Sequence, residues 1–186
     1  MRLAVYPGSF DPPTVAHLGI VAAARAHVAE VRLVLSEVAL GKEDQAGRTA
    51  VADRLAVLRA DGLAAVGTTA RLVVDIVEEA GADAVVMGAD KWAQVVDPAW
   101  YGSVAARDAA LARLPTVLLA ERAGTALPHL PAGVDAAGAG AALPLPPAGV
   151  VVLDVDPAHA EVSASRARAG EVDLMAPAAR ASGLWG

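Results

Sequence analysis

Short apolar runs alternate with longer amphipathic stretches along this chain. Runs rich in Val and Leu predict five strands, at Leu3–Tyr6, Val31–Leu35, Ala84–Met87, Thr116–Ala120 and Val150–Val155. The alanine-rich stretches between them predict helices at Val15–Val28, Val51–Arg59 and Ala70–Ala80, near Val104–Ala112 and near Ser163–Ala169. Strands that alternate with helices are typical of βα units, so we expect an α/β fold: a doubly wound parallel five-stranded sheet with helices on both faces.

The pattern also predicts one domain that spans residues 1–186. This length is enough for one sizeable core and too short for two ordinary domains. The segment 123–149 contains five Pro, five Gly and a single formal charge, Asp135. We interpret it as a long loop inside the domain rather than a linker, because the strand after it is needed to complete the sheet.

Composition narrows the range of partners. The chain has 15 Lys and Arg against 21 Asp and Glu, a net charge of −6, which argues against broad nucleic-acid binding. The absence of cysteine excludes disulfides, thiolate metal sites and cysteine nucleophiles. No secretory signal is recognised, and glycines and prolines interrupt the uncharged run 136–153, so we expect a cytoplasmic protein without a membrane partner.

The turn after the first predicted strand is the strongest candidate for chemistry. The stretch "VYPGSFDPPTVAHLGIV", residues 5–21, places Gly8 where a backbone could approach a ligand closely and Thr14 where it could cap the next helix. His17 then falls in the first helical turn, beside free N–H groups and the positive end of the helix dipole. Together with Ser9, this arrangement could hold phosphate oxygens.

The same stretch resembles a known signature. "PGSFDPPTVAH" is similar to the GxFDPxTxGH motif of the nucleotidyltransferase superfamily, the cytidylyltransferase-like enzymes, which implies a Rossmann-like fold and transfer of a nucleotidyl group to a phosphate. "VSASRARAG", residues 162–170, resembles the late ISSTxIR motif, with Ser163, Ser165 and Arg168 at matching positions. "VVMGADKW", residues 85–92, resembles the GAD strand end of nicotinate mononucleotide adenylyltransferases.

Other positions resemble these adenylyltransferases less closely. "LGKEDQAGRTAVADRLAVL" is similar to their segment after the second strand, with Lys42 at the phosphate-contacting lysine and Arg54 in the following helix. The aromatic after GAD corresponds to Trp100, shifted by about two residues. Their Thr-x-x-Thr-Leu element corresponds to Thr68–Leu72, with Arg71 in place of the second threonine. These departures fall on residues that the resemblance assigns to binding of the acceptor substrate. They therefore bear on the identity of that substrate more than on the type of reaction.

The resemblance implies attack by an acceptor phosphate on the α-phosphate of ATP, with release of pyrophosphate. Under it the catalytic residues are His17, Thr14, Lys42 and Arg168. The nucleotide-binding residues are Gly8, Ser9, Phe10, His17, Gly88, Asp90, Ser163, Ser165 and Arg168. The acceptor-binding residues are Lys42, Arg54 and Trp100. Mg²⁺ would be bound by phosphates with few or no protein ligands, and no dedicated metal site is expected.

Three functions stay open at this point. The first is an adenylyltransferase for nicotinate or nicotinamide mononucleotide, in NAD biosynthesis. The second is a phosphopantetheine adenylyltransferase of coenzyme A biosynthesis, or an enzyme of another cytidylyltransferase-like specificity, which leaves ATP or CTP as the donor. The third is a module that binds nucleotide without turnover. The expected partners are small-molecule nucleotides, and homo-oligomerisation is left open.

Overall fold

A computed structural model describes residues 1–37, 49–121, 146 and 148–186. Its centre is one six-stranded sheet in which every neighbouring pair is parallel. In chain order the strands are β1 (Leu3–Pro7), β2 (Glu30–Ser36), β3 (Ala64–Thr68), β4 (Ala84–Gly88), β5 (Thr116–Ala120) and β6 (Val150–Val152). Lys42 and nearly all of the predicted loop 123–149 lie outside the described residues.

The predicted doubly wound architecture is confirmed, but the sheet has six strands and not five. The strand order is 3-2-1-4-5-6, the order of the Rossmann fold. The additional strand, β3, is an edge strand in which Ala64, Val66 and Gly67 are exposed, and its short, alanine-rich segment was not predicted as a strand. Strand β6 ends at Val152, three residues before the predicted end, because the chain turns toward a 3₁₀ turn capped by Asp156.

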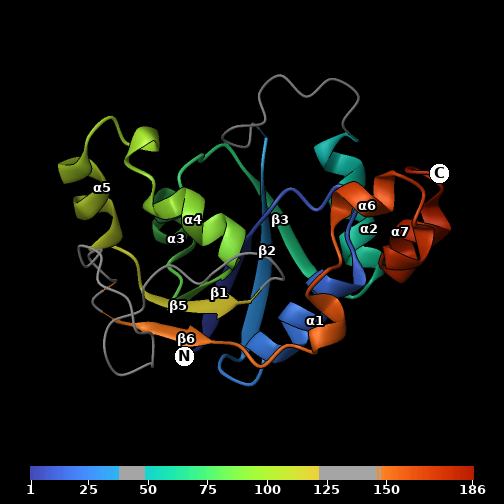
Figure 1. Cartoon of the computed structure of the whole chain (residues 1–186), viewed down its shortest axis with the longest axis horizontal. Coiled ribbons are helices and arrows are strands. Elements are labelled where there is room, and N and C mark those ends of the chain that lie inside the picture. Colours follow the sequence, from blue (N-terminus) through green and yellow to red (C-terminus); the bar gives the residue numbers. More distant parts are fainter. Residues whose placement is uncertain (38–48, 122–145, 147) are drawn as a thin grey trace.

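Helices cover both faces of the sheet (Figure 1). Helices α1 (Val15–Ala24) and α2 (Val51–Ala60) pack on one face, against side chains such as Leu33 and Val86. Helices α3 (Val73–Ala80), α4 (Ala89–Val96) and α5 (Val104–Leu111) pack on the other, against Val85 and Met87. The strand residues alternate between two apolar cores, which is why the central strands are buried throughout.

The predicted helices are present, but some of them begin or end at other residues than predicted. Helix α1 stops at Ala24 rather than Val28, and α3 begins at Val73 rather than Ala70. The later start of α3 has a local cause: Ser36 Oγ donates to the carbonyl of Ala70, and the Ala70 N–H donates to Thr68 Oγ1, so this segment is held out of the helix. Helix α4 was not predicted, since it follows β4 without an intervening loop.

The last part of the chain forms a small helical layer beside α2. It contains α6 (Ala164–Arg168) and α7 (Pro177–Ser182), of which only α6 was predicted. Ala167, Met175 and Ala179 pack with Val57 of α2 in a third apolar cluster. This layer lies next to the start of α1 (Figure 1), where it contacts the first turn. No helix in the described ranges combines the length and the apolar character that spanning a bilayer requires.

Candidate active site

Strands β1 and β4 are neighbours in the sheet, although the chain visits β2 and β3 between them. At this point the strand order reverses, and the connections after the two strands leave toward opposite faces. In open α/β sheets, ligands bind at such a switch point, beyond the carboxyl ends of the strands. The turn after β1, residues 8–13, and Gly88 at the end of β4 both lie there.

Phe10 organises the turn after β1. Its ring is 1% exposed and makes edge contacts with Tyr6, 5.2 Å between ring centroids, and with His17, 5.0 Å. Its backbone φ is +45°, in a region that favours glycine. The close approach of a ligand to Gly8 stays a prediction, but the structure shows a second reason for a glycine here: a Cβ at residue 8 would lie 2.7 Å from the Phe10 ring. The packing of Phe10 therefore favours a glycine at residue 8.

Thr14 and His17 form one hydrogen-bonded unit at the start of α1. The Thr14 backbone N–H donates to Nδ1 of His17 at 2.9 Å, and the Thr14 hydroxyl lies 2.8 Å from the same nitrogen. Because a backbone N–H can only donate, Nδ1 accepts, and the proton of the neutral ring is on Nε2. The predicted N-cap thus fixes both the orientation and the tautomer of His17, with Nε2–H as a donor.

The helical layer at the end of the chain supports the same turn. Trp185 Nε1 donates to Oδ1 of Asp11 at 2.7 Å, and Arg168 donates to the Asp11 carbonyl. Thr14 pairs with Met175 in an isolated antiparallel bridge. Asp11 is 3% exposed and Thr14 is 1% exposed, so these contacts are shielded from water. The turn is held from outside as well as by its own packing.

Arg54 supports the turn from the α2 side. It is 5% exposed, and its guanidinium donates to the carbonyl oxygens of Thr49, at 2.9 Å, and Ser9. Its predicted contact with an acceptor stays a prediction, whereas its contact with the first turn is direct. A buried cation that binds backbone carbonyls fixes the position of Ser9.

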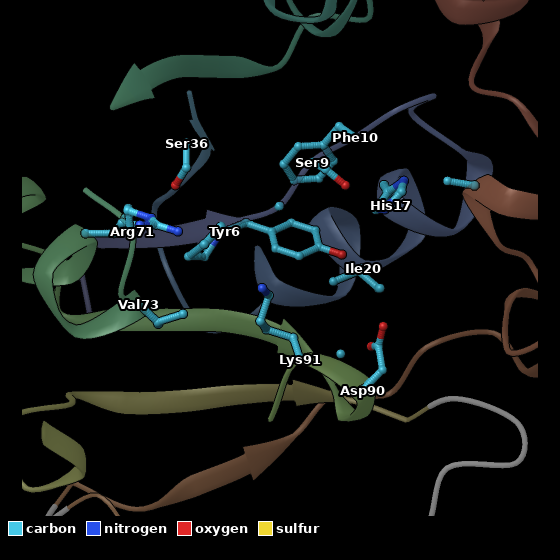
Figure 2. A pocket seen from close by; sticks show the side chains of 15 residues that line it. Tyr6, Ser9, Phe10, His17, Ile20, Ser36, Arg71, Val73, Asp90 and Lys91 are labelled. Carbon is cyan, nitrogen blue, oxygen red and sulfur yellow. The ribbon is translucent and has the colours of Figure 1, made fainter. Parts of the chain in front are cut away.

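A cleft opens at the switch point, with an empty volume of about 910 Å³ that includes its open mouth. It brings together six of the predicted site residues, Gly8, Ser9, Phe10, His17, Gly88 and Asp90. Figure 2 shows that the cleft is elongated: Ser36 and Arg71 lie at one end, His17 at the other, and Tyr6 between them.

A second cavity, with an empty volume of about 920 Å³ that includes its open mouth, adjoins the His17 end of the cleft. The two share the side chains of His17, Ile20 and Ala164. The second cavity also has an acidic rim, made by Glu121, Asp154 and Asp156. His17 therefore lies between two adjoining spaces, as a group acting at the junction of two bound molecules would.

The late motif lies at this junction, but its side chains are engaged locally. Ser163 caps α6 by accepting from the Arg166 N–H at 3.2 Å. Arg168 donates to Ser165 Oγ at 3.3 Å as well as to Asp11. Of this motif, Val162 and Ala164 are among the residues that line the two cavities, whereas Ser163, Ser165 and Arg168 are not. The predicted nucleotide contacts of Ser163, Ser165 and Arg168 stay predictions.

The predicted aromatic contact lies apart from the cleft. Trp100 lines a separate hollow that meets the cleft only at Asp90 and Lys91. The adjacent Tyr101 donates its hydroxyl proton to the Val95 carbonyl at 2.9 Å, and burial raises the pKa of the Tyr101 phenol. Tyr101 thus anchors the 3₁₀ turn that carries Trp100.

Two cations in the cleft were not among the predicted site residues. Lys91 follows Asp90 in α4 and donates to Gln94 Oε1 at 2.7 Å, and Arg71 precedes α3. Both side chains line the cleft, with Lys91 directed toward its middle (Figure 2). Two features of the sequence could have indicated these residues: Lys91 directly follows the GAD segment, and Arg71 replaces a threonine of the Thr-x-x-Thr-Leu element. In the described ranges, no three His, Asp or Glu side chains are grouped to hold a metal ion.

Comparison with solved structures agrees with the fold. A nicotinic acid mononucleotide adenylyltransferase of Plasmodium falciparum, complexed with NaAD, superposes with a TM-score of 0.62 at 14% identity, covering 90% of this chain and 82% of that one. A structure of the same enzyme complexed with APC gives a TM-score of 0.55 at 12% identity, with the same coverage. These likenesses show the fold.

The family is shown by the sequence itself. No curated protein matches the chain. The sequence model of the family described as cytidylyltransferase-like, however, matches residues 5–169, which span the first turn, the end of β4 and the late motif. The protein is thus a nucleotidyltransferase and belongs to the cytidylyltransferase-like family.

Proposed function

We propose that this nucleotidyltransferase transfers AMP from ATP to the phosphate of nicotinate mononucleotide, or of nicotinamide mononucleotide, and releases pyrophosphate. The observation that carries the proposal is the place of His17: this residue lines both cavities, and the hydrogen bond from Thr14 to Nδ1 leaves Nε2–H as its donor. The resemblance of the GAD segment, and the likeness in fold to a nicotinic acid mononucleotide adenylyltransferase, favour this acceptor.

In this reaction an oxygen of the acceptor phosphate attacks the α-phosphorus of ATP. The new P–O bond joins the two mononucleotides, and the bond from the α-phosphorus to the bridging oxygen breaks, so that pyrophosphate leaves with the electron pair. The protein needs to align the two phosphates and to stabilise charge on the nonbridging oxygens. His17 Nε2–H donates to the α-phosphate, and Thr14 holds the ring in that orientation.

The two cavities suit the two substrates. The donor base lies in the second cavity, where the carboxylates of Glu121, Asp154 and Asp156 can accept from an exocyclic amine. Adenine and cytosine both carry such an amine, so this rim suits ATP and CTP alike. The acceptor lies in the cleft with its phosphate toward His17, and Lys91 adds a positive charge along the path of the phosphates.

The residues at hand fit Mg²⁺ held mainly by phosphates. Asp90 is the one carboxylate among the described residues that line the cleft, which is too few for a protein cage and enough for one direct or water-mediated contact. When bound, Mg²⁺ would neutralise charge on the phosphate oxygens. The chain's own part is to position the phosphates with His17, Lys91 and the backbone of the first turn.

A pyrophosphate-release assay tests this function. The protein is incubated with Mg²⁺ and either ATP or CTP, against nicotinate mononucleotide, nicotinamide mononucleotide and phosphopantetheine as separate acceptors. Turnover with ATP and a pyridine mononucleotide supports the proposal. Turnover only with phosphopantetheine, or only with CTP, replaces it with another specificity of the family, and nucleotide binding without pyrophosphate from any pair replaces it with a non-catalytic module.

A further inference from the structure

We propose that Arg59 prevents the free edge of the central sheet from pairing with a second copy of this chain. The edge is strand β3, Ala64–Thr68, and the guanidinium of Arg59 binds one of the backbone carbonyls that such a pairing needs. Association between chains is a different property from the reaction, so it can be tested without the proposed function.

Alternate residues of β3 direct their backbone groups to opposite sides of the strand. The carbonyl of Thr68, the last residue of β3, accepts from the N–H of Glu37 directly after β2, so the backbone groups of Thr68 face β2. Every second residue before Thr68 faces β2 in the same way. The N–H and C=O groups of Ala65 and Gly67 therefore point to the other side, where the described part of the chain has no further strand.

The composition of β3 does little to prevent the addition of another strand. Its sequence, AAVGT, contains no charged residue and no proline, the residue types that commonly protect an edge strand. Val66 is 39% exposed, and Ala64 and Gly67 are exposed as well. Val66 and Gly67 also line a surface hollow beside the edge, so the approach to them is open. An apolar, exposed edge of this kind is a template for a second strand.

A second copy of β3 matches this edge. With a two-fold axis at Val66, antiparallel pairing places Ala65 of each chain opposite Gly67 of the other, and each such pair can exchange both of its N–H···O bonds. All of the outward backbone groups of Ala65 and Gly67 are then used. Because the same residues of both chains form the contact, this pairing closes at a dimer.

Arg59 binds a carbonyl that this pairing needs. It lies in the last turn of α2, and residues 61–63 lead from that helix into β3. Its Nε and Nη2 donate to the carbonyl oxygen of Ala65 at 3.1 Å and 2.8 Å. Since each pair in the symmetric register contains one Ala65, the guanidinium of each chain obstructs one pair, and the two together obstruct both. A charged side chain from the neighbouring helix thus supplies the protection that β3 itself lacks.

The test measures molar mass by light scattering over protein concentrations from about 1 to about 200 μM. The wild type is compared with Arg59→Ala, Arg59→Met and the control Arg25→Ala, which removes an exposed arginine at the end of α1. Methionine keeps an extended side chain and alanine does not, but neither can donate to the Ala65 carbonyl. Because Arg59 is exposed, its replacement should leave the fold intact, which the melting temperature verifies.

The double variant Arg59→Ala with Gly67→Pro identifies the surface. A proline at residue 67 removes an N–H that points away from β2, so it blocks the new pairing and leaves the bonds between β2 and β3 in place. Amide hydrogen exchange at Gly67 in the Arg59→Ala variant gives a second, site-specific measurement.

The expected result is association of the Arg59 variants alone. Both should approach twice the molar mass of the wild type as the concentration rises, and exchange at the Gly67 amide should slow by about tenfold or more in Arg59→Ala. Arg25→Ala and the double variant should match the wild type at every concentration.

Four results would overturn the proposal. Arg59 variants that keep the mass of the wild type would show that the guanidinium protects nothing. Association that survives Gly67→Pro would place the contact on another surface. A gain in mass with Arg59→Met but not with Arg59→Ala would point to the apolar side chain that was introduced. Growth beyond the dimer would contradict a pairing that closes on itself.

Discussion

Nε1 of Trp185 donates a hydrogen bond to Oδ1 of Asp11 over 2.7 Å, between residues 174 positions apart in the sequence. Asp11 is in the turn that leads to His17, and its carboxylate is almost completely buried. The C-terminal helical layer therefore has a direct part in the geometry of the candidate active site. Arg168 contacts the same residue, at its backbone carbonyl.

Replacing Trp185 with Phe should weaken this support without removing the ring. The variant loses the N–H donor and leaves one oxygen of a buried carboxylate without its partner, which should cost about 1–3 kcal/mol of unfolding free energy. We also expect a lower kcat, because the turn that orients Thr14 and His17 loosens. Urea unfolding and steady-state kinetics measure the two effects. Leu184→Ala, at an exposed neighbouring position, is the matched control; equal behaviour of the two variants would show that the hydrogen bond is dispensable.

His17→Ala should reduce kcat by about 10²–10³-fold, the usual effect of removing one donor to a transition-state oxyanion. The same change removes the acceptor for the Thr14 N–H, so a small loss of stability is expected as well. Binding of ATP, followed by calorimetry, should be reduced far less than kcat. His27→Ala changes an exposed histidine outside the site and should leave both quantities unchanged. Full turnover of the His17→Ala variant would refute the proposed role.

Asp83 gives a prediction for the pH dependence of stability. Its carboxylate accepts from the backbone N–H groups of Leu3 and Arg2, at 3.0 Å and 2.7 Å, and these bonds hold the pKa of Asp83 below its ordinary value. A lowered pKa means that this stabilisation is present above the unfolded pKa and is lost as the pH falls through the folded one.

The wild type should therefore lose stability over the acid range below about pH 4, near the unfolded aspartate pKa, in part through Asp83. Asp83→Asn should be less stable than the wild type at neutral pH, and the difference should shrink toward low pH. Urea unfolding of both proteins from pH 2.5 to 7 measures this. A difference that does not change with pH would show that the charge on Asp83 contributes nothing.

The sequence pattern was sufficient to predict the elements whose apolar residues form a continuous run or a regular repeat. Every residue of β4, Ala84–Gly88, is buried, so its apolar run is continuous and easily recognised. Strand β3 was missed because its short segment is rich in alanine, as the helices of this chain are, and its exposed Ala64, Val66 and Gly67 do not alternate strictly with buried residues. Helix α4 was missed because Gly88 ends a strand and caps a helix at once.

The positions of Thr14 as the N-cap of α1 and of His17 in its first turn could be predicted, because this arrangement is local. Thr14 and His17 are three residues apart, so helix geometry alone brings them together. The contacts of Asp11 with Trp185 and of Arg54 with Ser9 join segments that are distant in the chain, and no periodicity encodes them. The position of Arg71 in the cleft also depends on a contact between distant segments, since Ser36 and Thr68 hold the turn that precedes it.

Gly8→Ala tests whether the packing of Phe10 sets the geometry of the first turn. The added Cβ would lie 2.7–3.2 Å from three atoms of the Phe10 ring, which is buried between Tyr6 and His17 and cannot move aside without displacing one of them. Overpacking of this kind typically costs about 1–3 kcal/mol, and movement of His17 should lower kcat as well. Gly67→Ala is the control, because the nearest atom to its new Cβ is 3.7 Å away.

The double variant Gly8→Ala with Phe10→Leu tests whether the clash with the Phe10 ring is the reason that Gly8→Ala is destabilising. A leucine leaves out the ring atoms that the Cβ would meet, so the double variant should be destabilised by less than the sum of the two single changes. Chemical unfolding of the four proteins in the cycle gives the coupling free energy between the two positions. If the two effects simply add, the ring is not what excludes a side chain at residue 8, and the glycine is required by the ligand, as the sequence first indicated.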